Sequence, residues 1–344
     1  MALMSYKCPN CGGELKFDPG KQQYHCEYCI SDFDQETLDQ LQPERGTEEK
    51  AEDQEGAVVY SCPSCGAQII TDETTAASFC YYCHNPVVLS GRLEGEYLPD
   101  AILPFSITRE QALEAFEKFV KSRRFVPRSF YNKNQIDKIT GVYFPFWRCD
   151  CHLNGNLEAE GKTVRIWRVG DIEYTETKTY GISRAGELDF PELTRNALQK
   201  ANRMLVETVQ PFDLSGAKPF SMGYLSGFQA EKRDMEKDSF SESLQEDCRR
   251  YTREMLLDTV QGYASVNPRN TEIRVDKSDW SYLLLPVWVL TYRGKDNRLY
   301  YYAMNGQNGK TAGDLPTDQP KAAAFSAVLG VIVLILCLIG GYLI

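Results

Sequence analysis

Histidine is scarce in this sequence: only His25, His84 and His152 occur among 344 residues. His25 and His84 adjoin paired cysteines, where an imidazole more readily orients a metal ligand than acts as a base. The metalloprotease motif His-Glu-x-x-His and the hydrolase motif Gly-x-Ser-x-Gly are both absent. These absences predict that the protein is not an enzyme. An enzyme with a site in residues 96–318 is the alternative.

A complete nucleotide-binding loop is also lacking. Gly309-Lys310-Thr311 resembles the end of such a loop, but Met304 stands where its first glycine should be. No helix is expected to follow, and a phosphate site needs both the glycines and a helix N-terminus. The sequence therefore predicts no nucleotide, no other organic cofactor and no small-molecule substrate.

Basic residues are rare in the first part of the chain. Residues 1–95 contain 6 Lys and Arg against 16 Asp and Glu, whereas the remainder contains 32 of each. Nucleic-acid binding usually needs a basic face, because phosphate neutralisation supplies most of the non-specific affinity. Nucleic acid is therefore not the expected partner. A replication-related, nucleic-acid-associated protein is the alternative, because Tyr24, Tyr28, Tyr81 and Tyr82 could stack on bases.

The first sixteen residues lack the apolar run of a secretory signal peptide. Eight of the twelve cysteines have the spacing of metal ligands, and such thiols persist where the compartment is reducing. The N-terminal region is therefore expected in the cytoplasm.

Cysteine, in contrast, is abundant and regularly spaced. Two Cys-x-x-Cys pairs are separated by fourteen residues, and the whole arrangement recurs 54 positions later. Four thiolates in two such pairs give Zn²⁺ a closed tetrahedral shell, which leaves no position for a substrate. Disulfides or reactive dithiols are the alternatives, which the duplicated spacing disfavours. The sequence predicts two structural zinc ions, with the ligands Cys8, Cys11, Cys26, Cys29, Cys62, Cys65, Cys80 and Cys83.

The residue that follows each cysteine pair differs between the pairs. Gly12 and Gly66 follow the first pair of each set, where a positive φ is favourable. Ile30 and His84 stand at the corresponding position of the second pairs and match that requirement less well.

The cysteine sets define two tandem β zinc ribbons, at residues 5–33 and 58–90. The linker between them, residues 34–57, is acidic and nearly free of large apolar side chains after Leu41. Such a segment is expected to be solvated, so that the two ribbons could move independently. Short strands are expected at Leu15–Phe17, Gln23–His25, Val58–Tyr60 and Gln68–Ile70.

From residue 96 the pattern becomes mixed α and β. Thr108 and Gln111 form the capping box of a helix that reaches about Arg123. Asn154-Gly155 predicts a turn, and a shorter helix is expected to begin near Pro191. A long helix is expected over residues 230–262, with an apolar side made of Phe240, Leu244, Cys248, Tyr251, Met255 and Leu256.

Two short motifs recur in this region. Pro104-Phe105-Ser106 is echoed by Pro219-Phe220-Ser221, and Pro145-Phe146-Trp147 is echoed by Pro286-Val287-Trp288. These echoes indicate a duplicated α+β module with halves at residues 96–210 and 211–318.

Cys149, Cys151 and His152 are a candidate for a third metal site. The two cysteines fall on the same face of a strand, which suits ligation or core packing equally. No second pair of ligands is visible, and buried free cysteines are common. Core packing is therefore expected for these two cysteines, as for Cys248 and Cys337.

The end of the chain is apolar. Residues 322–344 carry no charge and include thirteen Phe, Val, Ile or Leu residues. A helix of this length reaches ~34 Å, enough for a hydrocarbon core of ~30 Å. Lys310 and Lys321 precede it and no basic residue follows. The positive-inside rule then predicts a single-pass membrane protein, tail-anchored in the cell membrane with its N-terminal region in the cytoplasm.

The cysteine pattern, the two Pro-x-Trp strands, the segment Asn305-Gly306-Gln307-Asn308-Gly309-Lys310 and the apolar end together resemble the YdjG-like proteins of Firmicutes. This family consists of double zinc-ribbon membrane proteins that are often labelled replication-organiser or primosomal-helicase-like. The sequence lacks the ATPase motifs that a helicase needs, so that activity is not implied here. The resemblance implies membrane association with SPFH-domain (flotillin-like) or PspA-like proteins in envelope stress.

The function expected from these features is that of an adaptor or scaffold, tethered to the membrane, whose acidic ribbons recruit cytosolic proteins. Tethering raises the effective concentration of both ribbons near the bilayer. The excess negative charge favours a basic partner surface and protein–protein interaction rather than binding to anionic lipid.

Overall fold

The computed structural model describes residues 3–4, 6–40, 53–54, 57–61, 68–72, 74–79, 86–89, 93, 95–127, 139–199, 203–293 and 298–342. The fold is mostly β-sheet and divides into two compact units. The first unit comprises Met1–Pro145, Leu198–Arg233 and Leu284–Ile344, and the second comprises Phe146–Ala197 and Asp234–Leu283. Residues 210 and 211, the predicted junction of the two module halves, both lie in the first unit. The duplication of the module stays a prediction.

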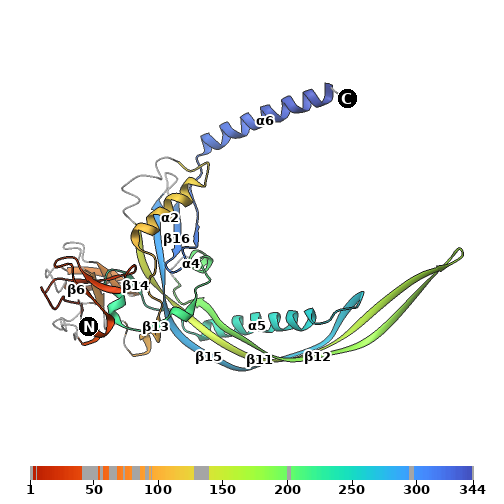
Figure 1. Ribbon diagram of the computed structural model, residues 1–344, viewed down its shortest axis with the longest axis horizontal. Helices are drawn as coiled ribbons and strands as arrows, with labels where there is room; N and C mark the ends of the chain where they lie inside the picture. Colours follow the sequence, from red (N-terminus) through yellow and green to blue (C-terminus); the bar gives the residue numbers. More distant parts are fainter. Residues whose placement is uncertain are drawn as a thin grey trace. The chain divides into compact units, whose positions relative to one another are not determined.

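The first unit contains the N-terminal strands, two short helices, the capped helix α2 and the C-terminal helix α6 (Figure 1). Its strands are β1 (Leu3–Met4), β2 (Leu15–Asp18), β3 (Gln23–Cys26), β4 (Asp32–Phe33), β5 (Asp53–Gln54), β6 (Ala57–Ser61), β7 (Gln68–Asp72), β8 (Thr75–Phe79), β9 (Pro86–Leu89), β10 (Ala101–Ile102), β13 (Lys218–Pro219), β14 (Gln229–Glu231), β16 (Leu299–Asn305) and β17 (Thr311–Gly313). Its helices are α1 (Gln35–Gln40), α2 (Arg109–Lys121), α4 (Arg203–Thr208) and α6 (Gln319–Tyr342).

Three sheets are present among the described residues. The largest has the strand order β1-β9-β8-β14-β11-β15-β10-β13. In addition, β12 (Ile172–Asn196) pairs with β11, β16 pairs with β15, and β17 pairs with β16. Two strands of this sheet, β11 (Thr140–Val169) and β15 (Ser265–Arg293), contribute residues to both units. The smaller sheets are β2-β3-β4 and β5-β6-β7, one from each predicted ribbon region. The strands expected in both regions are therefore present.

An aromatic cluster forms the core of the first unit. Phe105 stacks on Phe228 with ring centroids 4.3 Å apart, and the rings of Tyr143 and Trp288 each lie 5.0 Å from Phe105. The Trp288 indole N–H donates to the Ile107 carbonyl at 3.1 Å. Phe105 comes from the Pro-Phe-Ser motif and Trp288 from a Pro-x-Trp motif, so these recurring residues serve packing.

Asn305 ties the hairpin of β16 and β17 to the rest of the first unit. Its side chain is fully buried, and its Nδ2 donates to the carbonyls of Val209 and Pro211, at 3.1 Å each. Its Oδ1 accepts from the backbone N–H groups of Gln307 and Asn308 at 2.9 and 3.1 Å. All the hydrogen-bonding groups of this amide are therefore used inside the fold.

The same hairpin contains Gly309-Lys310-Thr311, the segment that resembles the end of a phosphate-binding loop. The strand β17 follows Lys310, where a phosphate-binding loop would lead into a helix. The Lys310 Nζ donates to the Gln210 carbonyl. These residues therefore stabilise a turn and do not have the geometry of a phosphate-binding loop.

Helix α2 follows the prediction closely. Thr108 and Gln111 form the reciprocal capping box, and the buried side is made of Ala112, Phe116 and Val120. The helix ends at Lys121, two residues before the predicted Arg123.

The second unit is a long hairpin of β11 and β12 (Ile172–Asn196), with part of β15 and helix α5 (Asp238–Asp258). The hairpin keeps one register from Gly155 opposite Gly186 to Val169 opposite Ile172. Helix α5 lies along these strands, and the hairpin continues beyond the end of the helix (Figure 1). Between helix and sheet lie the buried side chains of Cys149, Cys151, Leu153, Leu244 and Cys248.

The predicted turn at Asn154-Gly155 is wrong, because both residues lie inside β11. Glycine is required there by packing. A Cβ on Gly155 would lie 2.9 Å from side-chain atoms of both Leu256 and Thr252 on α5. The observed turn is at Gly170-Asp171, where Gly170 has a φ of +61°.

The shorter helix is present, but its predicted start near Pro191 is wrong. Strand β12 continues to Asn196, and the only helix described in that stretch of the chain begins at Arg203. Pro191 and Glu192 lie opposite Asp150, where the register shifts between Cys149 and Cys151. Glu192 has a φ of +60°, and its N–H donates to the Asp150 carboxylate at 2.6 Å. A proline within a strand is tolerated at such a bulge.

The apolar side of α5 differs in part from the prediction. Phe240, Leu244, Cys248 and Leu256 are buried, as expected. Thr252 completes the buried row at a spacing of four residues, whereas Tyr251 and Met255 are 45% and 52% exposed. The helix also begins later than predicted.

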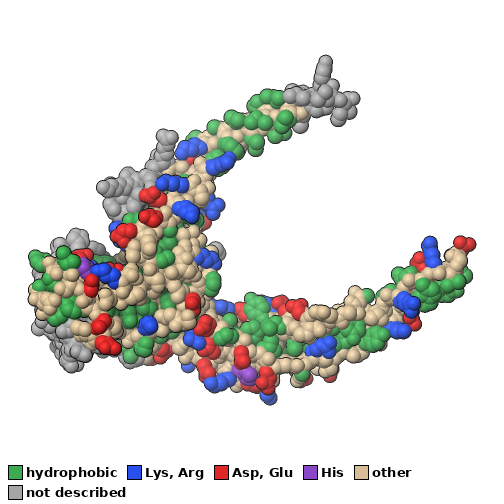
Figure 2. All heavy atoms as spheres, viewed as in Figure 1, with side chains coloured by type: hydrophobic (Ala, Val, Ile, Leu, Met, Phe, Trp, Pro, Cys, Tyr) green, Lys and Arg blue, Asp and Glu red, His purple; other side chains and the backbone are tan. Residues whose placement is uncertain are grey.

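Helix α6 begins at Gln319, three residues before the predicted Ala322. The Asp318 carboxylate accepts a hydrogen bond from the Lys321 N–H at 3.3 Å, which is a capping contact. Gln319–Leu336 has a mean hydropathy of 1.8 and no buried residue, so this helix is long and apolar enough to cross a membrane. Figure 2 shows its apolar side chains on the surface.

Replacing Asn305 by alanine should destabilise the first unit. The substitution removes two donated hydrogen bonds and leaves backbone N–H groups without their acceptor, which together cost about 3–4 kcal/mol. Chemical denaturation of the detergent-solubilised chain measures this loss. The exposed Asn156 is the matched control, because Asn156→Ala should change stability by no more than about 0.5 kcal/mol. Equal effects for the two variants would contradict the role given to Asn305.

Candidate metal centre

Four cysteines converge at the N-terminal sheet. Cys8 and Cys11 lie in the turn that the bridge between Lys7 and Glu14 closes, and Cys26 ends strand β3. Cys29 follows in the next turn. All four sulfur atoms lie within 4.8 Å of one another. The structure therefore brings together four of the eight predicted ligands.

The spacing of the sulfur atoms fits a tetrahedral metal site. Cys8 and Cys29 are 3.5 Å apart at their sulfurs, as are Cys11 and Cys26. A tetrahedron with Zn–S bonds of about 2.3 Å has sulfur–sulfur edges of about 3.8 Å. The separations are far longer than the ~2.05 Å bond of a disulfide. The four cysteines are free thiols that could hold one metal ion, consistent with zinc.

The backbone of the first pair turns sharply around the site. The Gly12 N–H donates to the Cys8 carbonyl at 2.8 Å, and the Cys8 N–H donates to the Gly13 carbonyl at 2.6 Å. Gly12 has a φ of +74°, which glycine adopts without strain. The Gly13 N–H also points at the Cys11 sulfur, 3.4 Å away. Amide groups directed at sulfur stabilise a thiolate.

The second pair makes the same turn without a glycine. The Ile30 N–H donates to the Cys26 carbonyl at 2.9 Å, and Ile30 has a φ of +57°. A β-branched residue in this region is strained by roughly 1–2 kcal/mol. Ile30 therefore adopts the same kind of turn as Gly12, and its poor match to the expected glycine appears as backbone strain.

The thiols of Cys29 and Cys11 differ in acidity. The Ser31 hydroxyl, 3.3 Å from the Cys29 sulfur, is the main cause of a Cys29 pKa lowered to about 6. The Gly13 N–H favours the Cys11 thiolate, but desolvation and the neighbouring sulfurs outweigh it and raise the pKa of Cys11 to about 12. Thiols that share one site titrate together in this way. A metal ion displaces their protons, so its affinity falls as the pH falls.

His25 faces away from the sulfurs. Its Nδ1 lies 2.6 Å from the Asp32 carboxylate, which also pairs with Lys21 at 2.7 Å. The Lys21 ammonium and then His25 hold the pKa of Asp32 below its usual value. The imidazole joins β3 to β4, and the predicted ligand-orienting role falls to Ser31 and the backbone amides instead.

The first ribbon packs against the segment 221–228 of its own unit. The Phe17 ring lies 5.4 Å from Tyr24 and 5.1 Å from Tyr224, in edge-to-face contacts. Tyr24 is 1% exposed. Tyr24 is among the tyrosines that could stack on bases by sequence, but its buried ring is not accessible to a base. Tyr28, in contrast, is 89% exposed.

Hydrogen bonds reinforce this packing. The Phe17 N–H donates to the Ser226 carbonyl at 3.0 Å, and the Gln22 side chain donates to the Phe105 carbonyl at 2.7 Å. Gln35 donates to the Ser221 hydroxyl at 2.9 Å. The first ribbon therefore packs and hydrogen-bonds as an integral part of the first unit.

The second predicted set of ligands lies outside the described residues. Cys62, Cys65, Cys80 and Cys83 belong to it, as do His84 and the tyrosines Tyr81 and Tyr82. The strands on either side are described: β6 pairs with β7, and β8 pairs with β9.

The third candidate site is a group of core cysteines. The sulfurs of Cys149 and Cys151 are 3.3 Å apart, and both side chains are buried with Cys248. Burial is the main cause of the raised pKa of Cys248, to about 12, and it also raises the pKa of Cys149. His152 points elsewhere and pairs with Asp189 at 2.6 Å. The burial of these thiols in an apolar core agrees with the packing role predicted for them.

Among the described residues, two hollows could hold ligands. A cavity of about 510 Å³ lies between the first ribbon and the start of α2, with Phe79, Phe228 and Trp288 among its apolar lining. At its rim the Lys16 ammonium and the Glu27 carboxylate pair at 2.8 Å. No metal-binding group of three or more side chains lines it within the described part of the chain.

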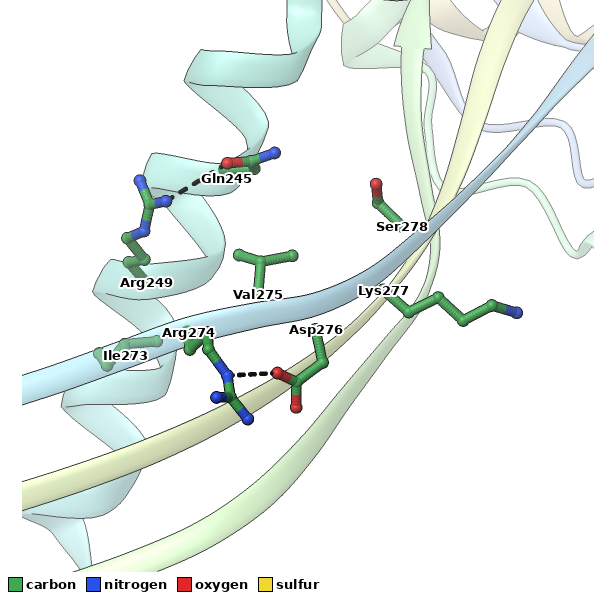
Figure 3. A pocket seen from close by; sticks show the side chains of 8 residues that line it. All are labelled: Gln245, Arg249, Ile273, Arg274, Val275, Asp276, Lys277 and Ser278. Carbon is green, nitrogen blue, oxygen red and sulfur yellow. Dashed lines mark hydrogen bonds and ion pairs between the residues drawn. The ribbon is translucent and has the colours of Figure 1, made fainter.

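The other hollow, of about 310 Å³, lies between α5 and β15 (Figure 3). Ile273 and Val275 point toward the helix, whereas Arg274 and Asp276 lie on the opposite side of the strand and pair at 2.6 Å. Hydrogen bonds from Asn154 and then Arg274 lower the pKa of Asp276. Within this lining, Arg274 and Asp276 therefore neutralise each other.

These features define a mostly β protein with a possible four-cysteine metal centre and one apolar C-terminal helix. The chain is 33% identical over 329 residues, 95% of each chain, to the uncharacterized protein YdjG of Bacillus subtilis (strain 168). The chain therefore belongs to the YdjG family. No protein-family model and no solved structure matches it.

Replacing Ile30 by glycine should stabilise the first ribbon. The φ of +57° is strained for isoleucine and free for glycine, and the Ile30 side chain is 77% exposed, so little buried surface is lost. The expected gain in unfolding free energy is about 1 kcal/mol, measured by denaturation of the zinc-loaded chain. Ile166 is the control, since it is 60% exposed within the regular strand β11. Ile166→Gly should lower stability; a loss for Ile30→Gly as well would refute the strain.

Proposed function

We propose that the protein is a membrane-tethered zinc-ribbon adaptor that recruits cytosolic proteins to the membrane surface. One observation carries the proposal: a closed four-cysteine set is built into the first unit, and the same chain carries an apolar helix with no buried residue in Gln319–Leu336. Four sulfur ligands complete the shell of zinc and leave no open position for a substrate. The ribbon then offers a rigid surface rather than a reacting group.

The second cysteine set supplies a second structural zinc. The strand pairs that flank it have the same spacing as those that flank the first set, shifted by 54 residues. The matching pairs are Lys7–Glu14 with Ser61–Gln68, and His25–Asp32 with Phe79–Pro86. Backbones that enter each Cys-x-x-Cys turn in the same register favour the same cage.

The zinc content should therefore be about two ions per chain. Cys11→Ser and Cys65→Ser should each remove one ion, because three thiolates hold zinc much more weakly than four. Elemental analysis of the purified, chelator-free chain measures this content. Cys248→Ser, which alters a core cysteine of the second unit, should keep both ions. A native content near one would overturn the second site, and a content near zero would overturn both.

Helix α6 anchors the chain in the cell membrane, with the preceding residues in the cytoplasm. Lys321 near the start of the helix supports this orientation by the positive-inside rule. Protease added to sealed inverted membrane vesicles should digest the first unit and leave the membrane-embedded end intact. Protection of the first unit in these vesicles would reverse the orientation.

The recruiting surface is the second Cys-x-x-Cys turn of the first ribbon. Tyr28 and Ile30 are 89% and 77% exposed there, on a backbone that the metal ligands hold fixed. An exposed tyrosine in an acidic region suits a basic partner face with an apolar patch, because aromatic anchors dominate protein interfaces. The family resemblance suggests SPFH-domain or PspA-like proteins as that partner.

Tyr28→Ala should abolish most of the partner recovery. Crosslinking and affinity purification from membranes, with the full-length chain as bait, compares the variant with the native protein. Tyr251→Ala is the matched control, since Tyr251 is also exposed but lies on α5. Recovery of the same proteins with all three baits would show that this turn is not the recruiting surface. Full-length variants are needed, because removing the ribbon would uncover Tyr224.

A further inference from the structure

The far end of the β11–β12 hairpin carries apolar side chains on its surface. Six of them, which we call the apolar tip, are between 41% and 61% exposed: Val164, Ile166, Trp167, Val169, Ile172 and Tyr174. They lie beyond Gly161 and Lys162. Tyr263, which follows α5, lies close to Gly161, and the Ala264 N–H donates to the Lys162 carbonyl at 2.7 Å. Green patches mark this end of the hairpin in Figure 2. Soluble monomers rarely leave such a patch uncovered without a functional reason.

The side chains of the apolar tip lie on both faces of the ribbon. Successive residues of a strand point to opposite faces, so Val164 and Ile166 share one face and Trp167 and Val169 the other. On the second face Trp167 pairs with Tyr174 and Val169 pairs with Ile172 across the hairpin. The Trp167 and Tyr174 rings stack at 5.6 Å with an angle of 11°.

Four charged residues near the tip form ion pairs along the ribbon. Arg168 lies 3.4 Å from Glu173, and Lys178 lies 3.4 Å from Glu176. The Arg165 guanidinium sits over the Trp167 ring at 5.7 Å. A strongly charged partner would have to break these pairs, so apolar contact is the main attraction that the tip offers.

We propose that the apolar tip inserts into the interfacial layer of a lipid bilayer. A protein groove covers one face of a two-stranded ribbon, whereas a bilayer surrounds the ribbon and contacts both. Tryptophan and tyrosine favour the depth of the headgroups, and arginine and lysine extend their charged ends toward water there. This contact is distinct from α6 and does not depend on α6 crossing the membrane.

The length of the tip sets the depth of insertion. Val164 to Val169 spans roughly 17 Å at 3.3 Å per residue, close to the ~15 Å of hydrocarbon in one leaflet. The outer edges of a two-stranded ribbon carry unpaired backbone groups, which hydrocarbon does not satisfy. Asp171 at the turn also needs water or a headgroup. The ribbon therefore enters obliquely and stays within one leaflet.

Trp167 itself reports the contact. The full-length chain is reconstituted in phosphatidylcholine vesicles with and without brominated acyl chains, and tryptophan emission is compared. Native protein should be quenched by the brominated lipid, and Trp167→Phe should lose most of that quenching. Trp280→Phe is the matched control, because Trp280 packs against Trp147 in the second unit and its loss should leave the quenching in place. A far-UV circular dichroism spectrum that matches the native protein verifies the folding of each variant.

A photo-crosslinker at Ile172 separates a bilayer from a second copy of the chain. Irradiation in the same vesicles should yield chain–lipid adducts. Equal quenching of native protein and Trp167→Phe would overturn the proposal. Crosslinked dimers without lipid adducts would also overturn it and assign the tip to self-association. Quenching and lipid adducts should persist at high salt and without anionic lipid, because the ion pairs leave no net attraction to charge.

Discussion

The stacking of Phe105 is the interaction on which the first unit depends. Its ring contacts Phe228, Tyr143 and Trp288, and its carbonyl accepts the Gln22 side chain of the first ribbon. One residue therefore joins the ribbon, the strands of the main sheet and the approach to α2. Large aromatic surfaces dominate core energetics, so segments that are distant in the chain are held together at this point.

The four-cysteine cluster is held against this core by the packing of the first ribbon. A small ribbon buries little apolar surface by itself and usually relies on its metal. Here Phe17 and Tyr24 add a second source of stability, because they pack on Tyr224 outside the ribbon. The exposed side of the ribbon, with Tyr28 and Ile30, is then held in a fixed orientation relative to the rest of the first unit. On the proposed function, this is the surface that a partner would contact.

In the second unit, apolar residues lie both in a buried core and on the surface. Helix α5 covers the hairpin where Cys149, Cys151 and Leu153 are buried, and glycine at position 155 allows the close approach. Beyond the helix the same strands continue without cover, and their apolar side chains lie on the surface. The change from a buried face to an exposed apolar tip is therefore a consequence of strand length exceeding helix length.

The sequence by itself determined the features that depend on neighbouring residues: the cysteine spacing, the capping box at Thr108 and the uninterrupted apolar run of α6. It could not determine why Gly155 is a glycine, because the side chains that require it come from α5, about a hundred residues later. Nor could it show that Pro191 sits in a bulge opposite Asp150, or that Tyr24 is covered by Tyr224. Turn and proline signals describe local backbone preference, and only tertiary packing decides whether that preference becomes a turn, a bulge or a close contact.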